Sequence, residues 1–355
     1  MNNNEIIELG CDVFSKITSD LNENIYSKSN GRLSIHWHTD ELFYAYAGSD
    51  PKAIDSPKHS IGITYYTLIL LYGDIEEYYF YIEYGADNSN FDIIFKDFEY
   101  PKTLSSFSPK EHCCKNMFIS GITWILFHEL GHLIQEHGYV RSHYNCDEGI
   151  KIIDCAANDS KSKTPLSGKA SAVSHVTEMA ADFYATISCL RSLLFHFEGE
   201  ELEAEIKSFT SALALVLYRF HGNNSYVPTE IPEGTHPQPL VRLEQTMPLV
   251  FETYSNSGLL KDRRSNLTRL DLINITSWSS ITAGFFWLRK NGKTNISDDY
   301  FLSGSQQRPG MTRYHKIILE TWDEIKPVID KVKRINDPIT ELEFNAHYRE
   351  ILSAE

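Results

Sequence analysis

Residues 118–132 of this 355-residue chain read FISGITWILFHELGH, and this stretch decides how the rest of the sequence is interpreted. Its first part is apolar, and its end carries His128 and His132 on either side of Glu129. Positions four residues apart share one face of an α-helix, so both imidazoles point towards the same place. Two histidines and a glutamate on a buried helix are costly unless they are paired or bind a metal. The stretch therefore predicts a buried helix that holds a zinc ion.

The glutamate of this HExxH pattern has a different expected task. Glu129 directly follows His128, so it flanks the metal instead of binding it. In that place it can take a proton from a water molecule held by zinc, whose pKa falls from about 16 towards 7. We expect His128 and His132 to be metal ligands and Glu129 to be the catalytic base. A chance HExxH on a core helix is the alternative.

A second expected helix, residues 172–197, supplies a candidate for the third zinc ligand, which the first helix lacks. A catalytic zinc ion takes three protein ligands and leaves a further position for water and substrate. Glu178 and Asp182 are four residues apart on one helical face. Glu178 is expected to be the third ligand. Asp182 is expected to accept a hydrogen bond from the free ring nitrogen of a ligand histidine, His128 being the favoured one, and so to fix its tautomer.

Two other interpretations of this helix stay open. Without the HExxH, Glu178 and Asp182 would be read as the solvated face of an amphipathic helix. His175 is a competing ligand, and is otherwise expected at the surface or next to the site. Ala180 and Ala181 are small enough to let this helix approach the first one closely.

The order of these motifs resembles that of the gluzincin metallopeptidases, where HExxH precedes a helix bearing Glu and then Asp four residues later. The segment from Thr235 to Arg242, which contains His236-Pro237, is similar to the downstream His-Pro and Arg of peptidase family M48. ImmA/IrrE-type regulatory peptidases and Lit-like phage-exclusion peptidases are soluble proteins with similar motifs. The resemblance covers roughly residues 116–245 and implies a zincin-type metallopeptidase core.

The resemblance also implies roles for the third motif and for the whole protein. His236 is expected to donate a hydrogen bond to the oxyanion as water attacks the carbonyl. Arg242 is expected to pair with a carboxylate of the site or to hold the His-Pro loop. The implied function is that of a zinc-dependent endopeptidase acting on an intracellular protein. A regulatory or sensor module with a latent or inactive site is one alternative, and a structural protein with an accidental HExxH is another.

The fold class expected from the whole chain is α+β, in three regions: residues 1–105, 106–250 and 251–355. Alternating and aromatic-rich runs in the first region predict a small antiparallel sheet of three to five strands. The expected strands lie within 33–38, 60–71, 78–84 and 91–95. The expected helices cover residues 6–21, 116–138, 172–197, 203–220 and 311–335, and Gly138 is expected to end the second of these. The polar stretch 139–170 is expected to be a loop long enough to cover the cleft.

Composition limits the partners and the compartment. The formal net charge is −15, so the chain lacks the excess of positive charge that is typical of proteins that bind nucleic acid. The N-terminus lacks the pattern of a signal peptide, and the longest apolar stretches fall short of the roughly 20 residues that a membrane span needs. The six cysteines are sparse and contain no CxxC, as in proteins with reduced thiols. We expect a cytoplasmic protein whose partner is a protein or peptide substrate.

Overall fold

The computed structural model describes residues 1–50, 56–85, 87–97, 103–104, 109–146, 166–222, 229–255, 258–292, 301, 308, 310–335 and 341–353. The chain begins with a helix, a short 3-10 turn and three strands: α1 (Asn3–Asn24), η1 (Tyr26–Ser29), β1 (Arg32–His38), β2 (Ala45–Ser49) and β3 (Lys58–Thr64). The helices that carry the candidate site or hold it in place are α4 (Lys110–Ile134), α5 (His137–His143), α6 (Gly168–His196), α8 (Pro239–Ser255) and α12 (Met311–Val332). The others are α2 (Tyr65–Tyr84), α3 (Asn88–Ile94), α7 (Gly199–His221), α9 (Leu259–Asp262), α10 (Arg269–Lys290) and α13 (Ala346–Ser353). The protein is thus a mostly helical α+β protein.

The sheet is mixed, so the prediction of an antiparallel sheet was wrong. The strand order is β1-β3-β2, with β1 parallel and β2 antiparallel to the central strand β3. The prediction of a strand at 33–38 is confirmed by β1. The predicted strand at 60–71 was only half right, because β3 ends at Thr64, whose side chain accepts a hydrogen bond from the backbone N–H of Thr67 and caps α2.

Two other predicted strands are helical. Residues 78–84 belong to α2 and residues 91–94 to α3. The aromatic side chains that suggested strands are used in helix packing instead. Tyr78 is fully buried, and its hydroxyl lies 2.7 Å from Thr282 Oγ1 on α10, while its ring meets the edge of Phe286. Tertiary packing therefore overrides the strand preference of these aromatic residues.

The long helices match their predicted ranges with shifted ends. The ranges 6–21 and 203–220 lie within α1 and α7, α6 spans 168–196, and α12 ends at Val332. Gly138 does not end the helix that carries His128. That helix, α4, stops at Ile134, the chain turns at Glu136, and Gly138 lies inside α5. The predicted loop 139–170 therefore begins with a helix, and its residues 147–165 lie outside the described residues.

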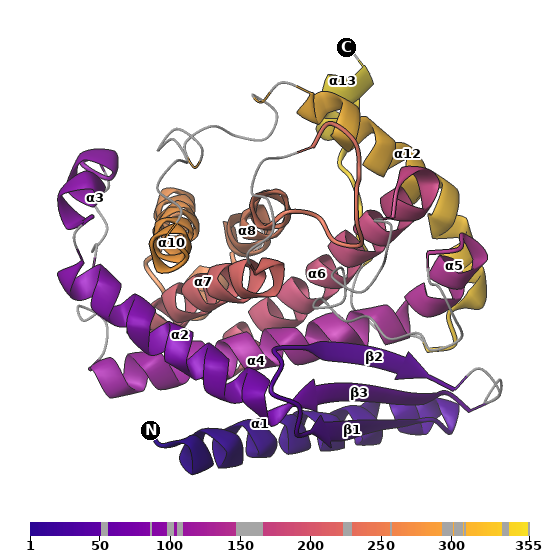
Figure 1. Ribbon diagram of the computed structural model, residues 1–355. Helices are drawn as coiled ribbons and strands as arrows, with labels where there is room; N and C mark the ends of the chain where they lie inside the picture. Colours follow the sequence, from indigo (N-terminus) through magenta and orange to yellow (C-terminus); the bar gives the residue numbers. More distant parts are fainter. Residues whose placement is uncertain are drawn as a thin grey trace.

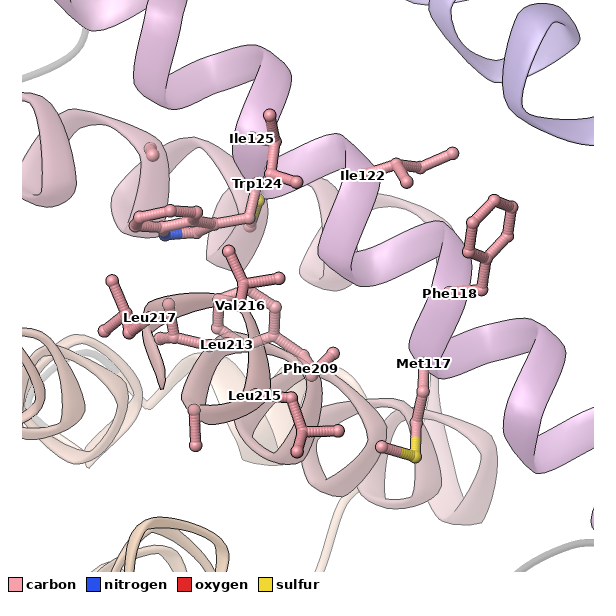
Figure 2. Packing of buried hydrophobic residues seen from close by; sticks show 14 of the residues in the cluster. Met117, Phe118, Ile122, Trp124, Ile125, Phe209, Leu213, Leu215, Val216 and Leu217 are labelled. Carbon is pink, nitrogen blue, oxygen red and sulfur yellow. The ribbon is translucent and has the colours of Figure 1, made fainter. Parts of the chain in front are cut away.

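Helix α4 lies at the centre of the arrangement (Figure 1) and packs against α6, α7, α2 and strand β2. Its Trp124 side chain points towards α7, where Val216 and Leu217 face it, as Figure 2 shows. The other labelled residues of this cluster are Met117, Phe118, Ile122, Ile125, Phe209, Leu213 and Leu215. All ten are buried, with at most 1% of each exposed. The packed interior fixes the helix that carries the first motif.

Two apolar clusters make up the core. The larger one includes residues from Ile6 to Ile335, and so draws on all three predicted regions. The smaller one joins α6 to α12 through residues such as Val176, Ile318 and Trp322. The division into three regions stays a prediction.

One helix among the described residues, α4, is long and apolar enough to cross a membrane by length and composition alone. In its apolar window, 83% of the residues are buried inside the protein. The core helix of a folded domain has this property as well.

The crossing of α4 and α6 depends on a glycine within the HExxH. A Cβ atom on Gly131 would lie 3.1 Å from Ala181 Cα and 3.2 Å from Tyr184 Cβ. The expectation that Ala180 and Ala181 let the helices approach closely is consistent with this contact. Close packing at this point brings together the helix faces that carry the predicted ligands.

We expect Gly131→Ala to destabilise the metal-free protein by about 1 kcal/mol. Overpacking costs about 1–3 kcal/mol, and the higher helix propensity of alanine offsets up to about 1 kcal/mol of that. Gly73→Ala in α2 is the matched control, since its Cβ would meet nothing within 4 Å. In this control, the free energy of unfolding should rise by up to about 1 kcal/mol. Urea unfolding checks both, and a stabilised Gly131→Ala protein would contradict the tight crossing.

Candidate metal centre

Three predicted ligands meet where α4 and α6 cross. The Nε2 atoms of His128 and His132 are 3.2 Å apart. Glu178 reaches them from α6, with Oε2 3.3 Å from His128 Nε2 and Oε1 3.3 Å from His132 Nε2. One donor atom of each residue lies within 4.8 Å of the other two, and all three residues are buried. Two imidazole nitrogens and one carboxylate oxygen at this spacing can hold a metal ion.

Asp182 and Arg242 lie behind the His128 imidazole. Asp182 Oδ1 is 2.9 Å from His128 Nδ1, which is the contact expected for a carboxylate that fixes the tautomer of a ligand. Arg242, from α8, donates to both oxygens of Asp182, Nε at 2.7 Å and a terminal nitrogen at 2.6 Å. Of the two roles expected for Arg242, the structure shows the pairing with a carboxylate. Trp124 stacks on the face of the His128 ring, with ring centroids 5.1 Å apart.

The charges of these groups favour a cation between the imidazoles. Burial raises the pKa of Glu178, but the imidazoles of His236 and His132 and the hydrogen bonds from His128 and His132 outweigh it, so the pKa lies well below its usual value. Burial lowers the pKa of His128, but its hydrogen bonds with Asp182 and Glu178 outweigh burial and raise it. The carboxylates thus attract positive charge to the position that a metal ion would take.

The catalytic base predicted from the sequence is next to this cluster in the chain. Glu129 follows His128 on α4 and is only 4% exposed. His128 and His132 are 6% and 5% exposed. The whole group therefore lies in an environment where electrostatic interactions are stronger than in water.

His236 reaches the cluster from a loop that α6 holds. Its Nε2 atom is 3.5 Å from Glu178 Oε1, and its Nδ1 atom is 2.6 Å from Thr235 Oγ1. Ser171 donates to the carbonyl of Gly234, and Ser174 donates to that of Thr235. The His236 side chain is 15% exposed, more than the other imidazoles and carboxylates of the cluster. The structure thus brings the third motif to the edge of the first two.

His137 contacts the cluster, although the sequence did not single it out. Its Nδ1 atom lies 2.9 Å from His132 Nδ1. Burial, followed by the charges of His132 and Arg141, places the pKa of His137 well below its usual value, so its ring is neutral. When His132 uses Nε2 for a metal, its Nδ1–H donates to His137. His137 thereby has for His132 the orienting position that Asp182 has for His128.

Arg141 is the second residue that the sequence did not single out. It is 4% exposed and donates from one terminal nitrogen to Glu178 Oε1 at 2.7 Å and to the carbonyl of Ser174 at 3.2 Å. Its Nε–H donates to Thr177 Oγ1 at 2.8 Å. Glu178 therefore lies between two guanidinium groups, since Arg242 is 3.6 Å from Oε2. These contacts hold the third predicted ligand in one orientation.

The competing ligand His175 lies away from the three donor atoms. Its Nδ1 atom is 2.9 Å from the hydroxyl of Tyr314 on α12, and its Nε2 atom is 3.1 Å from the carbonyl oxygen of Glu233. Burial lowers its pKa to about 3, which keeps it neutral. It is 3% exposed, so the expectation of a surface position was wrong. Its role is to join α6 to α12.

The three sequence motifs therefore form one buried centre with two imidazoles, a carboxylate ligand and orienting partners for each. Such a centre suits a divalent cation that prefers nitrogen and oxygen donors. No protein-family model, no curated protein and no solved structure matches this chain.

Proposed function

We propose that this protein is a zinc-dependent endopeptidase of the gluzincin kind, most similar to peptidase family M48, and that it acts on an intracellular protein. The observation that carries the proposal is the meeting of His128, His132 and Glu178 from two helices, with their donor atoms within 4.8 Å. Glu129, beside the first ligand, is the base that hydrolysis requires.

Zinc is the proposed ion because the donor set fits it. Catalytic zinc sites commonly use two histidines and a glutamate, with a fourth position left for water. A bound zinc ion would lower the pKa of coordinated water towards 7 and polarise the substrate carbonyl. The five cysteines that the structure describes lie outside the cluster, so this set offers nitrogen and oxygen only.

The residues around the metal position have separate roles in proton transfer, oxyanion stabilisation and ligand orientation. Glu129 accepts the proton of the attacking water and passes it to the leaving amine. His236, at the exposed edge of the cluster, donates a hydrogen bond to the oxyanion that forms on the carbonyl. Asp182 and His137 hold the ligand imidazoles, and Arg242 holds Asp182.

A regulatory or sensor module with a latent site is the second candidate. The low exposure of His128, Glu129 and His132 favours it, because a substrate has to reach buried groups. The complete set of ligands, base and orienting residues favours the peptidase. The two candidates differ in whether any protein is cleaved.

Comparison of wild-type protein with Glu129→Gln in cells tests the proposal. New protein N-termini are mapped by mass spectrometry in both. We expect a set of cleavage products that requires wild-type protein and disappears in the variant, because only the base has been removed. Identical N-termini in the two samples, with both proteins folded and loaded with zinc, would contradict the peptidase and favour the latent module.

A further inference from the structure

The turn between α4 and α5 has an unfavourable backbone conformation. Glu136 has φ 51° and ψ 37°, in the left-handed region that a residue with a Cβ atom rarely adopts. This turn ends the ligand helix α4 and begins α5 without a glycine. An interaction elsewhere must therefore hold Glu136 in place.

The side chain of Glu136 is held by an arginine from the other end of the chain. Arg334, two residues after α12, contacts both carboxylate oxygens, Nε at 2.6 Å and a terminal nitrogen at 3.1 Å. The same nitrogen lies 2.9 Å from Ser49 Oγ at the end of β2 and 3.3 Å from His59 Nε2 on β3. His59 is in turn 2.8 Å from the hydroxyl of Tyr26. The two charged side chains are 20% and 10% exposed, so the pair is largely shielded from water.

The turn carries two contacts to the candidate ligands. His137 follows Glu136 directly, and its Nδ1 atom lies 2.9 Å from that of His132. Arg141, one turn further along α5, donates to Glu178 Oε1 at 2.7 Å. A change in the direction of the chain at Glu136 would move both contacts at once.

We propose that Arg334 is a positioning residue of the metal centre. By binding the Glu136 carboxylate in a bidentate pair, it keeps the turn left-handed and keeps His137 and Arg141 against His132 and Glu178. The inference rests on the proposed function, because it assumes that these ligands hold zinc. It assigns to the segment after α12 an effect on metal affinity that acts through the turn at Glu136, although this segment contains no ligand.

Two substitutions at position 136 separate this role from a general loss of stability. Glu136→Ala removes the pair, and because alanine also disfavours the left-handed region, nothing then holds the turn in its shape. Glu136→Gly removes the pair, but glycine adopts the left-handed region readily, so the turn keeps its shape. We expect the glycine variant to bind zinc more tightly than the alanine variant. In the glycine variant, adding Arg334→Ala should change the affinity little.

The test measures the zinc dissociation constant of the full chain by competition with a chromophoric chelator. Arg334→Ala is expected to weaken zinc binding by about 10-fold, the lower end of the range for residues that orient metal ligands. Arg334→Lys should recover only part of this loss, because an ammonium group cannot make the bidentate pair. Arg349→Ala is the matched control, since Arg349 makes a bidentate pair with Asp323 on α12 and should leave the affinity unchanged.

The outcomes distinguish the inference from the proposed function. Wild-type zinc affinity in Arg334→Ala would overturn the inference and leave the zinc site intact. Failure of the wild-type protein to bind zinc would overturn the proposed function, and the inference with it. Should Arg334→Ala fail to fold, the position-136 variants decide, and equal zinc affinities for Glu136→Gly and Glu136→Ala would overturn the inference.

Discussion

Glu129→Gln is expected to keep its zinc and to lower kcat for peptide cleavage by about 10²–10⁴-fold, the usual contribution of a positioned acid or base. Glutamine has nearly the same shape as glutamate but cannot accept the proton of the attacking water. The ligands His128, His132 and Glu178 are unchanged, so metal binding should persist. The loss should therefore appear in kcat with little change in KM.

A peptide spanning a mapped cleavage site provides the measurement, together with the zinc content of each protein. Glu111→Gln is the matched control, because it is the same change on an exposed position of the same helix, α4. It should cleave at the wild-type rate. Full activity in Glu129→Gln would remove the proposed base and with it the mechanism.

Arg242→Met is expected to destabilise the metal-free protein by about 3–5 kcal/mol, the cost of leaving one partner of a buried ion pair uncompensated. Arg242 and Asp182 are 4% and 1% exposed and share two hydrogen bonds. Methionine fills much of the same volume, so the lost charge is the main change. Of the contacts described above, Asp182 would keep the one with His128, and Glu178 would lose its contact with Arg242.

A second bidentate pair in the same protein provides the control. Arg349 donates to both oxygens of Asp323 at 2.7 and 2.8 Å, and the two side chains are 40% and 52% exposed. Arg349→Met should therefore cost no more than about 1 kcal/mol. Urea unfolding at neutral pH measures both variants. Equal losses in the free energy of unfolding would show that burial does not set the strength of the Arg242–Asp182 pair.

The site was predictable from sequence where it depends on regular helices. The spacing of four residues placed His128 and His132 on one face of α4, and Glu178 and Asp182 on one face of α6, and the structure brings these faces together. His137 was not predictable in this way. In an unbroken helix it would lie roughly 140° around from His132, and only the left-handed turn at Glu136 brings the two rings together.

The fold was less predictable in the N-terminal region. Alternation of apolar residues indicated β1 correctly, but it does not state which strands pair or in which direction. The parallel pairing of β1 with β3 depends on the connection through β2, which alternation does not encode. The aromatic run of α2 has the composition of a strand. The residues that pack on Tyr78 are on α10, far away in the sequence, so the local sequence does not indicate the helix.

We propose that His128, His132 and Glu178 hold one zinc ion per chain. Zinc K-edge X-ray absorption of the purified full chain reports both the amount of bound zinc and its neighbouring atoms. We expect one equivalent of zinc with nitrogen and oxygen neighbours at about 2.0–2.2 Å and no sulfur neighbour. Protein without zinc after exposure to it, or a sulfur neighbour at about 2.3 Å, would contradict the claim.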